Sequence, residues 1–94
     1  MRRIRWSPAA AADLESISHY LSEHHPSYRA PTIAKLYDAA RSLKQMPNRG
    51  RIGQTPGTRD LSMNPLPYII MYGVEPDMVH IFRILHAAQD RPSE

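Results

Sequence analysis

Apolar residues recur at helical spacing in the first part of the chain. They follow one another three or four residues apart, at Ala10, Leu14, Ile17 and Leu21. Asp13, Glu15 and Glu23 lie largely off this stripe. Ser7 and Pro8 precede it, and a serine N-cap followed by proline at the first helical position is a strong helix start. The pattern predicts one amphipathic helix of about 17 residues.

A second helical stripe follows a short break at residues 24–27. Ser27 is suited to cap this second helix, and Pro31 then falls within its first turn, where proline is tolerated. The apolar positions of the stripe are Ile33, Leu36, Tyr37, Ala40 and Leu43. Because so few residues join the two helices, we expect them to form an antiparallel hairpin.

Beyond the second helix the apolar spacing changes to two, which is typical of strands. The pattern predicts three short strands at residues 58–63, 68–74 and 78–85, and a further short strand at residues 3–6. The last strand is expected to place Val79, Ile81, Arg83 and Leu85 on one face and His80, Phe82 and Ile84 on the other. The expected fold class is therefore α+β, in the order β-α-α-β-β-β, with an antiparallel sheet packed against the helical hairpin.

The segment 47–57 shows neither period and contains three of the four glycines. A loop of this length more often marks function than chance. Arg49 and Arg51 flank Gly50 within it. We therefore expect a loop that presents two arginines to a partner.

Composition narrows the classes of function. The 94 residues fit a single domain spanning residues 1–94. The absence of cysteine excludes disulfides, thiolate metal sites and a thiol nucleophile, and it suits the reducing cytoplasm. No apolar run approaches the roughly 18 residues that cross a membrane, so no membrane association is expected.

The formal net charge of +3 rests mainly on arginine, because Lys35 and Lys44 are the only lysines among the 12 basic residues. Guanidinium groups suit phosphate and carboxylate, so the alternatives are an acidic partner and a solvated basic surface. Arg59 and Arg83 are each expected on a strand face with apolar neighbours. They indicate either a converging anion site, or surface pairs with Asp60, Asp77 or Asp90.

The histidines are the other candidates for chemistry. His19, His24 and His25 lie around the end of the first helix, where solvated residues near a helix C-terminus are favoured over a metal site. His86 ends the last strand beside Arg83, and it is either a general acid or base, or a structural residue that closes the sheet. No recognised catalytic or nucleotide-binding motif is present, so motifs do not decide whether the chain is an enzyme.

The order of elements and the residues of the second half resemble the RelE/ParE toxin superfamily. The most specific stretches are Arg59-x-Leu61, Pro67-Tyr68-Ile69-Ile70-Met71-Tyr72-x-Val74 and Asp77-x-Val79-x-Ile81-x-Arg83-Ile84-Leu85-His86-Ala87-Ala88-Gln89-Asp90. The resemblance implies the growth-arresting toxin of a bacterial type II toxin–antitoxin pair, cytoplasmic and without cofactor or metal. It also implies a tight hetero-oligomeric complex with a cognate antitoxin, whose extended and helical C-terminal segment wraps the toxin.

The superfamily has two kinds of target. The RelE branch cleaves messenger RNA on the ribosome, and the ParE branch is associated with poisoning DNA gyrase. RNA-cleaving members tend to carry arginine directly after the tyrosine of the third strand, where this chain has Ile69, and a basic residue near Gln89. The ending from Arg83 to His86 is more typical of ParE-like sequences. The resemblance therefore favours a gyrase poison that is not an enzyme, with a ribosome-dependent mRNA endonuclease as the alternative.

The pattern and the resemblance together define a candidate site. Four arginines are expected to bind the target or another anion: Arg59, Arg83, Arg49 and Arg51. His86 is expected to be catalytic only if the chain cleaves RNA. An apolar groove between helices and sheet is expected where the antitoxin docks. Its candidate lining residues, each of which has burial in the core as the alternative, are Leu14, Tyr20, Ile33 and Tyr37.

Overall fold

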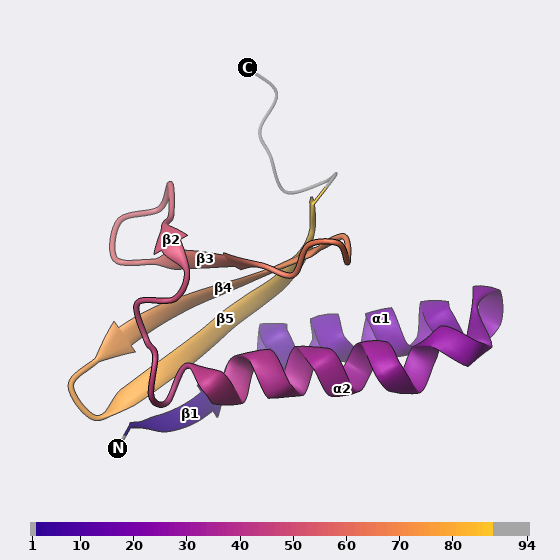
Figure 1. Ribbon diagram of the computed structural model, residues 1–94, viewed down its shortest axis with the longest axis horizontal. Coiled ribbons are helices and arrows are strands. Elements are labelled where there is room, and N and C mark those ends of the chain that lie inside the picture. The colour runs from indigo at the N-terminus through magenta and orange to yellow at the C-terminus, as the bar shows by residue number, and fades with distance from the viewer. Residues whose placement is uncertain (1, 88–94) are drawn as a thin grey trace.

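The structure is a computed structural model that describes residues 2–87. Five strands form one sheet, and two antiparallel helices cover one of its faces (Figure 1). The elements are β1 (Arg3–Trp6), α1 (Pro8–His24), α2 (Pro26–Ser42), β2 (Arg51–Ile52), β3 (Arg59–Ser62), β4 (Tyr68–Glu75) and β5 (Met78–His86). The α+β class with its helical hairpin is confirmed. Gln89 and Asp90 lie outside the described residues.

The strand order in the sheet is β1-β5-β4-β3-β2. β3, β4 and β5 pair antiparallel, as predicted, and β2 pairs antiparallel with β3. β1 instead runs parallel to β5, so the sheet is mixed, and the prediction of an antiparallel sheet is corrected for this strand. A parallel pair needs a long connection, which the helices and the intervening strands supply. The loop after α2 also contributes the short strand β2, which the sequence pattern does not indicate.

Ser7 is the N-cap of α1, as predicted. Its Oγ accepts a hydrogen bond from the backbone N–H of Ala10 at 2.9 Å. The same hydroxyl donates to the carbonyl oxygen of Phe82 at 2.8 Å. The cap therefore satisfies a free donor of the helix and also ties the start of α1 to β5.

The start of α2 differs from the prediction. The helix begins at Pro26, and His25 at the cap position makes no side-chain hydrogen bond to it. Proline at the first position is already set for the helix and has no N–H to satisfy, so the helix starts without a serine cap. Pro31 consequently lies inside the helix, beyond its first turn, and cannot donate to the carbonyl of Ser27. The predicted cap at Ser27 is therefore wrong.

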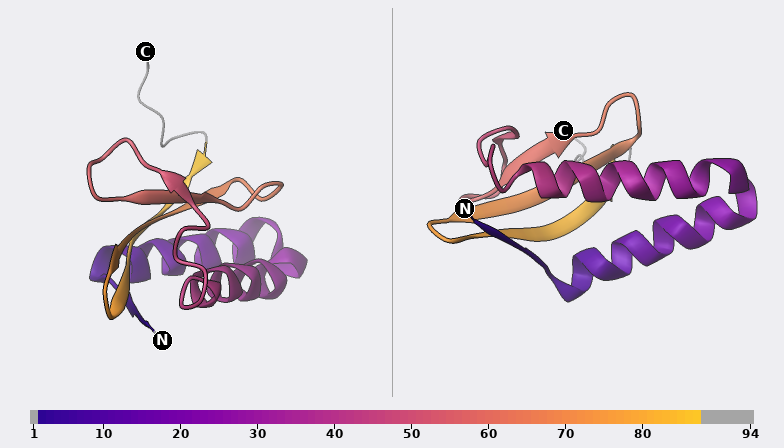
Figure 2. Two further views of the ribbon diagram at one scale, coloured as in Figure 1. Left: turned by 60° about the vertical axis from the view of Figure 1, so that its left-hand side comes forward. Right: turned by 60° about the horizontal axis from the view of Figure 1, so that its bottom comes forward.

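The hydrophobic core lies between the hairpin and the sheet, which pack as two layers (Figure 2). Its largest fully buried side chains are Leu36, Leu43, Ile70, Tyr72, Val79 and Ile81. Full burial of one such side chain contributes about 1.5–3 kcal/mol. The helical and strand periods therefore converge on one core, as the sequence pattern predicts.

A β-bulge interrupts the pairing of β4 with β5 at Met71 and Tyr72. Phe82 is the extra residue on β5, because Tyr72 is opposite Ile81 while Met71 is opposite Arg83. The added residue resets the alternation of faces beyond it. Arg83 is exposed and the next residue along is buried, so the prediction that Arg83 shares a face with the buried residues before the bulge is wrong.

Tyr72 fixes the loop after α2 to the sheet. Its buried hydroxyl accepts from the N–H of Gly50 at 2.8 Å and donates to the carbonyl of Pro47 at 2.7 Å. Arg59 Nη1 donates to the carbonyl of Gly50 at 2.8 Å. A Cβ at Gly50 would lie 2.8 Å from the carbonyl oxygen of Asp60, so only glycine allows this close approach. Residues 47–50 are thereby held in one conformation.

Replacing Tyr72 with Phe leaves the Gly50 N–H and the Pro47 carbonyl without their partner. We expect the free energy of unfolding to fall by about 1–3 kcal/mol, the usual cost of unsatisfied buried groups. Urea denaturation followed by circular dichroism measures the loss. Tyr37→Phe is the matched control, because Tyr37 is 44% exposed and its change should stay within about 0.5 kcal/mol. Equal stability of the two variants would contradict the role given to Tyr72.

Candidate functional site

A groove of about 1180 Å³ opens between the helical hairpin and the ends of β4 and β5. The hairpin extends well past the sheet on this side, so the two layers have different lengths there (Figure 1). Apolar residues that line the groove include Ile17, Leu21, Leu66, Pro67 and Leu85. We call this feature the hairpin groove. Its size and its apolar lining suit a docked protein segment.

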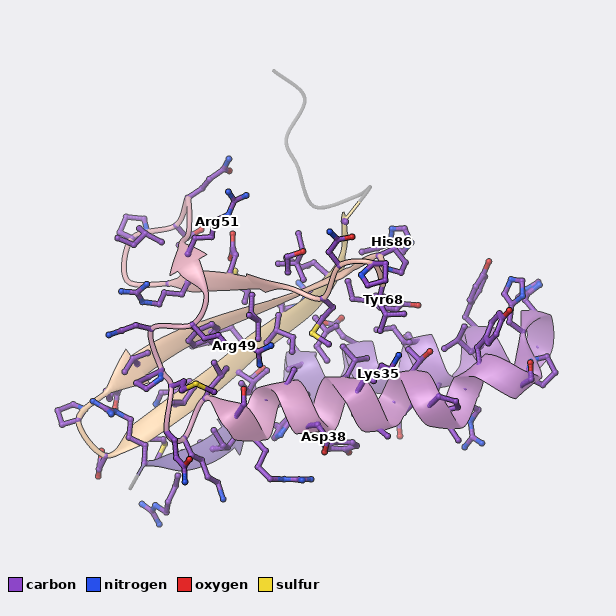
Figure 3. All side chains as sticks on the ribbon, in the orientation of Figure 1. Lys35, Asp38, Arg49, Arg51, Tyr68 and His86 are labelled. Carbon is purple, nitrogen blue, oxygen red and sulfur yellow. The ribbon has the colours of Figure 1, made fainter. Side chains whose placement is uncertain are left out.

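Tyr68 and His86 lie together at the sheet end of the hairpin groove, and Lys35 extends from α2 toward them (Figure 3). The rings of Tyr68 and His86 meet edge to face, with centroids 5.8 Å apart. Burial raises the pKa of Tyr68, and Tyr20 on α1 raises it further. Within residues 2–87 no hydrogen bond or ion pair holds the Lys35 ammonium. A phenol, an imidazole and an unpaired cation thus line the same end of the groove.

Asp13 links α1 to the end of β5. Its carboxylate accepts from Arg83 Nε at 2.7 Å, from Arg83 Nη2 at 3.0 Å and from the backbone N–H of Ile84 at 2.9 Å. The Asp13 side chain is only 17% exposed. Burial raises the pKa of Asp13, but the hydrogen bonds and the charge of Arg83 outweigh it, so the pKa lies below its ordinary value. This charge-assisted, bidentate ion pair holds α1 against the end of β5 at the wall of the hairpin groove.

The importance of Asp13 is missed by the sequence reasoning, which places it off the apolar stripe of the first helix. A signal was available, since Asp13 follows Ala10 by three residues and precedes Ile17 by four. That spacing puts all three on one helix face. Glu15 and Glu23, by contrast, are exposed as expected.

Exposed aromatic rings cluster at the turn of the hairpin. Tyr20 contacts His24 at 4.5 Å between centroids, and His25 stacks on Tyr28 at 5.9 Å. Tyr20 is 53% exposed and Tyr28 is 62% exposed. Both tyrosines line the hairpin groove. Large rings that stay exposed at a groove are typical of a docking surface.

The structure does not form a converging site from Arg59 and Arg83. Arg59 donates to the carbonyl of Gly50 near β2, whereas Arg83 pairs with Asp13 of α1. β4 lies between the two strands that carry them. Arg83 therefore follows the alternative of an ion pair, although with an aspartate that the sequence reasoning does not name. A part for either arginine in target binding stays a prediction.

Arg49 and Arg51 are both exposed on the loop around Gly50 (Figure 3). Arg49 Nη1 donates to the Oγ of Ser42 at 2.8 Å. No partner holds the Arg51 guanidinium within the described part of the chain. Because Tyr72 immobilises Gly50, the loop presents the two arginines from a rigid base.

The four residues expected to line the groove have different places. Tyr20 lines the hairpin groove. Leu14 is buried in the core and Ile33 packs partly buried against it. Tyr37 packs on Trp6, with ring centroids 5.3 Å apart, and is not among the lining residues. Tyr20 is therefore the one of the four that lines the groove, Leu14 and Ile33 take the alternative place in or against the core, and Tyr37 stays 44% exposed beside Trp6. Contact of Tyr20 with an antitoxin stays a prediction.

His19, His24 and His25 do not assemble a metal site with neighbouring acids. His19 Nε2 lies 3.3 Å from the carboxylate of Glu23. Among residues 2–87 no group of three histidine, aspartate or glutamate side chains is placed to hold a metal ion. No helix in the same residues is long and apolar enough to cross a membrane.

Sequence comparisons connect the chain to toxins. The family model described as "ParE toxin of type II toxin-antitoxin system, parDE" matches residues 4–91. The Y4kP protein of Sinorhizobium fredii is 35% identical over 91 residues, which cover 97% of this chain and 94% of that protein. Toxin RelE2 of Caulobacter vibrioides is 39% identical over 89 residues, which cover 95% of this chain and 99% of that protein.

Solved structures share the same architecture. The chromosomal ParDE toxin–antitoxin system from P. aeruginosa matches with a TM-score of 0.84 and 26% identity, covering 92% of this chain and 96% of that chain. The toxin–antitoxin complex RelBE2 from Mycobacterium tuberculosis matches with a TM-score of 0.69 and 19% identity, covering 90% of this chain and 96% of that chain. The second likeness shows a common fold alone.

Asp13→Asn tests the link between α1 and β5. We expect the free energy of unfolding at neutral pH to fall by about 1–2 kcal/mol, because the charged hydrogen bonds are lost from a partly exposed pair. The lowered pKa of Asp13 adds stability above the unfolded pKa near 4, and this is lost as the pH falls through the lower folded pKa. Urea denaturation from pH 7 down to pH 2 should therefore show the difference from wild type shrinking in acid.

Asp38→Asn is the control for this measurement. Asp38 pairs with Arg41 at 3.1 Å on an exposed helix surface, where both side chains are more than half exposed. Its replacement should cost less than about 0.5 kcal/mol at any pH. Similar losses in both variants, or a loss that grows in acid, would contradict the role of Asp13.

Proposed function

Because the chain belongs to the ParE toxin family of type II toxin–antitoxin systems, we propose that it arrests growth by binding and poisoning DNA gyrase. In this proposal a cognate antitoxin, docked in the hairpin groove, keeps it inactive. The family match covers nearly the whole described fold, residues 4–91. Being a type II toxin is the established part. The target, and the site of the antitoxin, are the proposal.

The residue after Tyr68 is the main reason for proposing gyrase, and not the ribosome, as the target. RNA-cleaving members of the superfamily tend to have an arginine there, which stabilises charge at the scissile phosphate, and this chain has Ile69. Ile69 is 7% exposed and apolar, so it offers no charge to a phosphate. RNA cleavage through the 2′-hydroxyl needs a base, an acid and a cation at the phosphate. The nearby Arg83 is committed to Asp13.

The segment around Gly50, which carries Arg49 and Arg51 and which we call the basic loop, supports a target-binding role without catalysis. Arg51 is exposed, unpaired within residues 2–87 and presented by a loop that Tyr72 fixes. Arg49 lies on the other side of Gly50. Guanidinium groups on a rigid base can pair with carboxylates or phosphates at low entropic cost. The higher structural likeness to a ParDE system than to the RelBE2 complex agrees with this assignment.

The hairpin groove is the proposed site of the antitoxin. Solved structures that resemble the chain include a ParDE toxin–antitoxin system and the toxin–antitoxin complex RelBE2. An amphipathic segment can lay its apolar face against Ile17 and Leu85, while Tyr20 and Tyr28 close over it. Lys35 then faces an acidic side chain of the antitoxin. A tight hetero-oligomer follows from the size of the groove and its apolar lining.

Ribosome-dependent mRNA cleavage is the second candidate function. His86 lies against Tyr68, and both face the groove that Lys35 lines, so an acid, a base and a cation are present in one place. A relative at 39% identity is named Toxin RelE2. The two functions differ in what they require of His86, which makes them separable.

Purified chain is expected to inhibit supercoiling of relaxed plasmid by DNA gyrase. Arg51→Ala should weaken the inhibition about three- to tenfold, because an exposed charge contact is lost. Arg29→Ala is the matched control, since Arg29 is an exposed arginine on the hairpin and away from the basic loop. His86→Gln should inhibit as well as wild type. Unaffected supercoiling, together with A-site cleavage of translated messenger that His86→Gln abolishes, would establish the second function instead.

Tyr28→Ala is expected to weaken binding of the cognate antitoxin about 10- to 100-fold, the range of a buried aromatic anchor. Tyr28 is 62% exposed in the free chain, so its removal should leave the fold intact. Isothermal titration calorimetry with the antitoxin measures the change. Ile52→Ala is the control, because Ile52 is 80% exposed on β2 and outside the groove. Equal losses for both variants would place the antitoxin elsewhere.

A further inference from the structure

The outer side of β1 is an open sheet edge. β1 pairs with β5 on one side, and within residues 2–87 no strand pairs with it on the other. Arg3 N–H donates to the Asp77 carbonyl and Ser7 N–H to the Ile81 carbonyl, so the odd-numbered residues face β5. Ile4 and Trp6, which alternate with them, direct their N–H and C=O groups outward. Within residues 2–87 no hydrogen bond outside the ladder engages the backbone of these two residues.

The side chains of β1 give this edge two different faces. Arg3 and Arg5 are exposed on one face, and no ion pair or hydrogen bond holds either guanidinium within the described residues. Ile4 and Trp6 are half-buried on the other face, against the core. The ring of Tyr37 packs on Trp6 there and stays 44% exposed. The edge is therefore cationic on one side and aromatic on the other.

We infer that this edge of β1 docks an extended acidic segment of a partner protein, which adds a strand to the sheet. The backbone of the segment pairs with the open groups of Ile4 and Trp6. Residues directly opposite one another in paired strands lie within side-chain contact, so acidic residues at alternate positions meet Arg3 and Arg5. The intervening residues are apolar and lie on the side of Trp6 and Tyr37. Main-chain pairing supplies affinity, and the alternation supplies specificity.

Charge excludes a second copy of the chain from this edge. Pairing β1 with another β1 places arginines against arginines, and like charges directly opposite are destabilising. A nucleic acid would satisfy Arg3 and Arg5 but has no backbone that matches the outward N–H and C=O groups of Ile4 and Trp6. An acidic strand satisfies both sets of groups.

This edge is distinct from the hairpin groove. β1 lies at the end of the fold that carries the β4–β5 turn, whereas the start of β4 and the end of β5, which line the groove, lie at the opposite end, toward the turn of the hairpin (Figures 1 and 2). No residue of β1 lines the groove. The inference therefore does not rest on the proposed target, and the two can fail separately.

A blocked hexapeptide that alternates glutamate with valine is the probe, titrated into the full ¹⁵N-labelled chain and followed by NMR. We expect the largest amide shifts at Ile4 and Trp6, with slower hydrogen exchange at both. Arg3→Glu combined with Arg5→Glu should weaken binding at least about tenfold. Arg29→Glu, at an exposed arginine on the helical hairpin, should leave the affinity within about twofold.

The same peptide with lysine in place of glutamate separates charge recognition from general strand addition. Equal binding of the lysine peptide, shifts that map away from β1, or no shifts at millimolar peptide would overturn the inference. Stronger shifts at β1 with a short oligothymidylate than with the glutamate peptide would overturn it in favour of nucleic acid. Unchanged amide shifts of Val79 and Ile81 establish that the β1 variant is folded. If they move, the conservative pair Arg3→Gln and Arg5→Gln replaces it.

Discussion

The carboxylate of Asp13 accepts a backbone hydrogen bond at the end of β5 that a neighbouring strand would otherwise accept. β1 ends at Trp6, opposite Ile81, so in the described part of the chain the last residues of β5 have no strand neighbour on that side. Asp13 accepts the backbone N–H of Ile84 there and pairs through both oxygens with Arg83. A single side chain thus joins the hairpin to the sheet where the two layers begin to separate. The walls of the hairpin groove depend on that joint.

The two ends of the molecule differ in structure. At one end the core is closed, and Tyr72 holds the loop that carries Arg49 and Arg51. At the other end the hairpin extends past the sheet, and Tyr68 and His86 face an open groove (Figure 3). In the proposal, the rigid basic surface binds the target and the apolar groove binds the antitoxin. The absence of charge at Ile69 then separates binding from cleavage in the proposal.

Local signals in the sequence predict the elements well. Ser7 and Pro8 begin α1, the helical stripes mark the hairpin, and the period of two marks the strands. What escapes prediction depends on contacts between residues far apart in the chain. The parallel pairing of β1, the bulge at Phe82 and the partner of Arg83 are of this kind. The bulge alone shows the difficulty, since one extra residue reverses the face on which Arg83 is expected.

A toxin directed at gyrase and one directed at the ribosome stop different syntheses first. The chain is expressed in cells without its antitoxin, and the incorporation of labelled thymidine and labelled methionine is followed over the first minutes. This experiment measures DNA synthesis and protein synthesis together. With gyrase as the target, we predict that thymidine incorporation falls first while methionine incorporation continues. An immediate fall in methionine incorporation, with thymidine incorporation continuing, would contradict the assignment to gyrase.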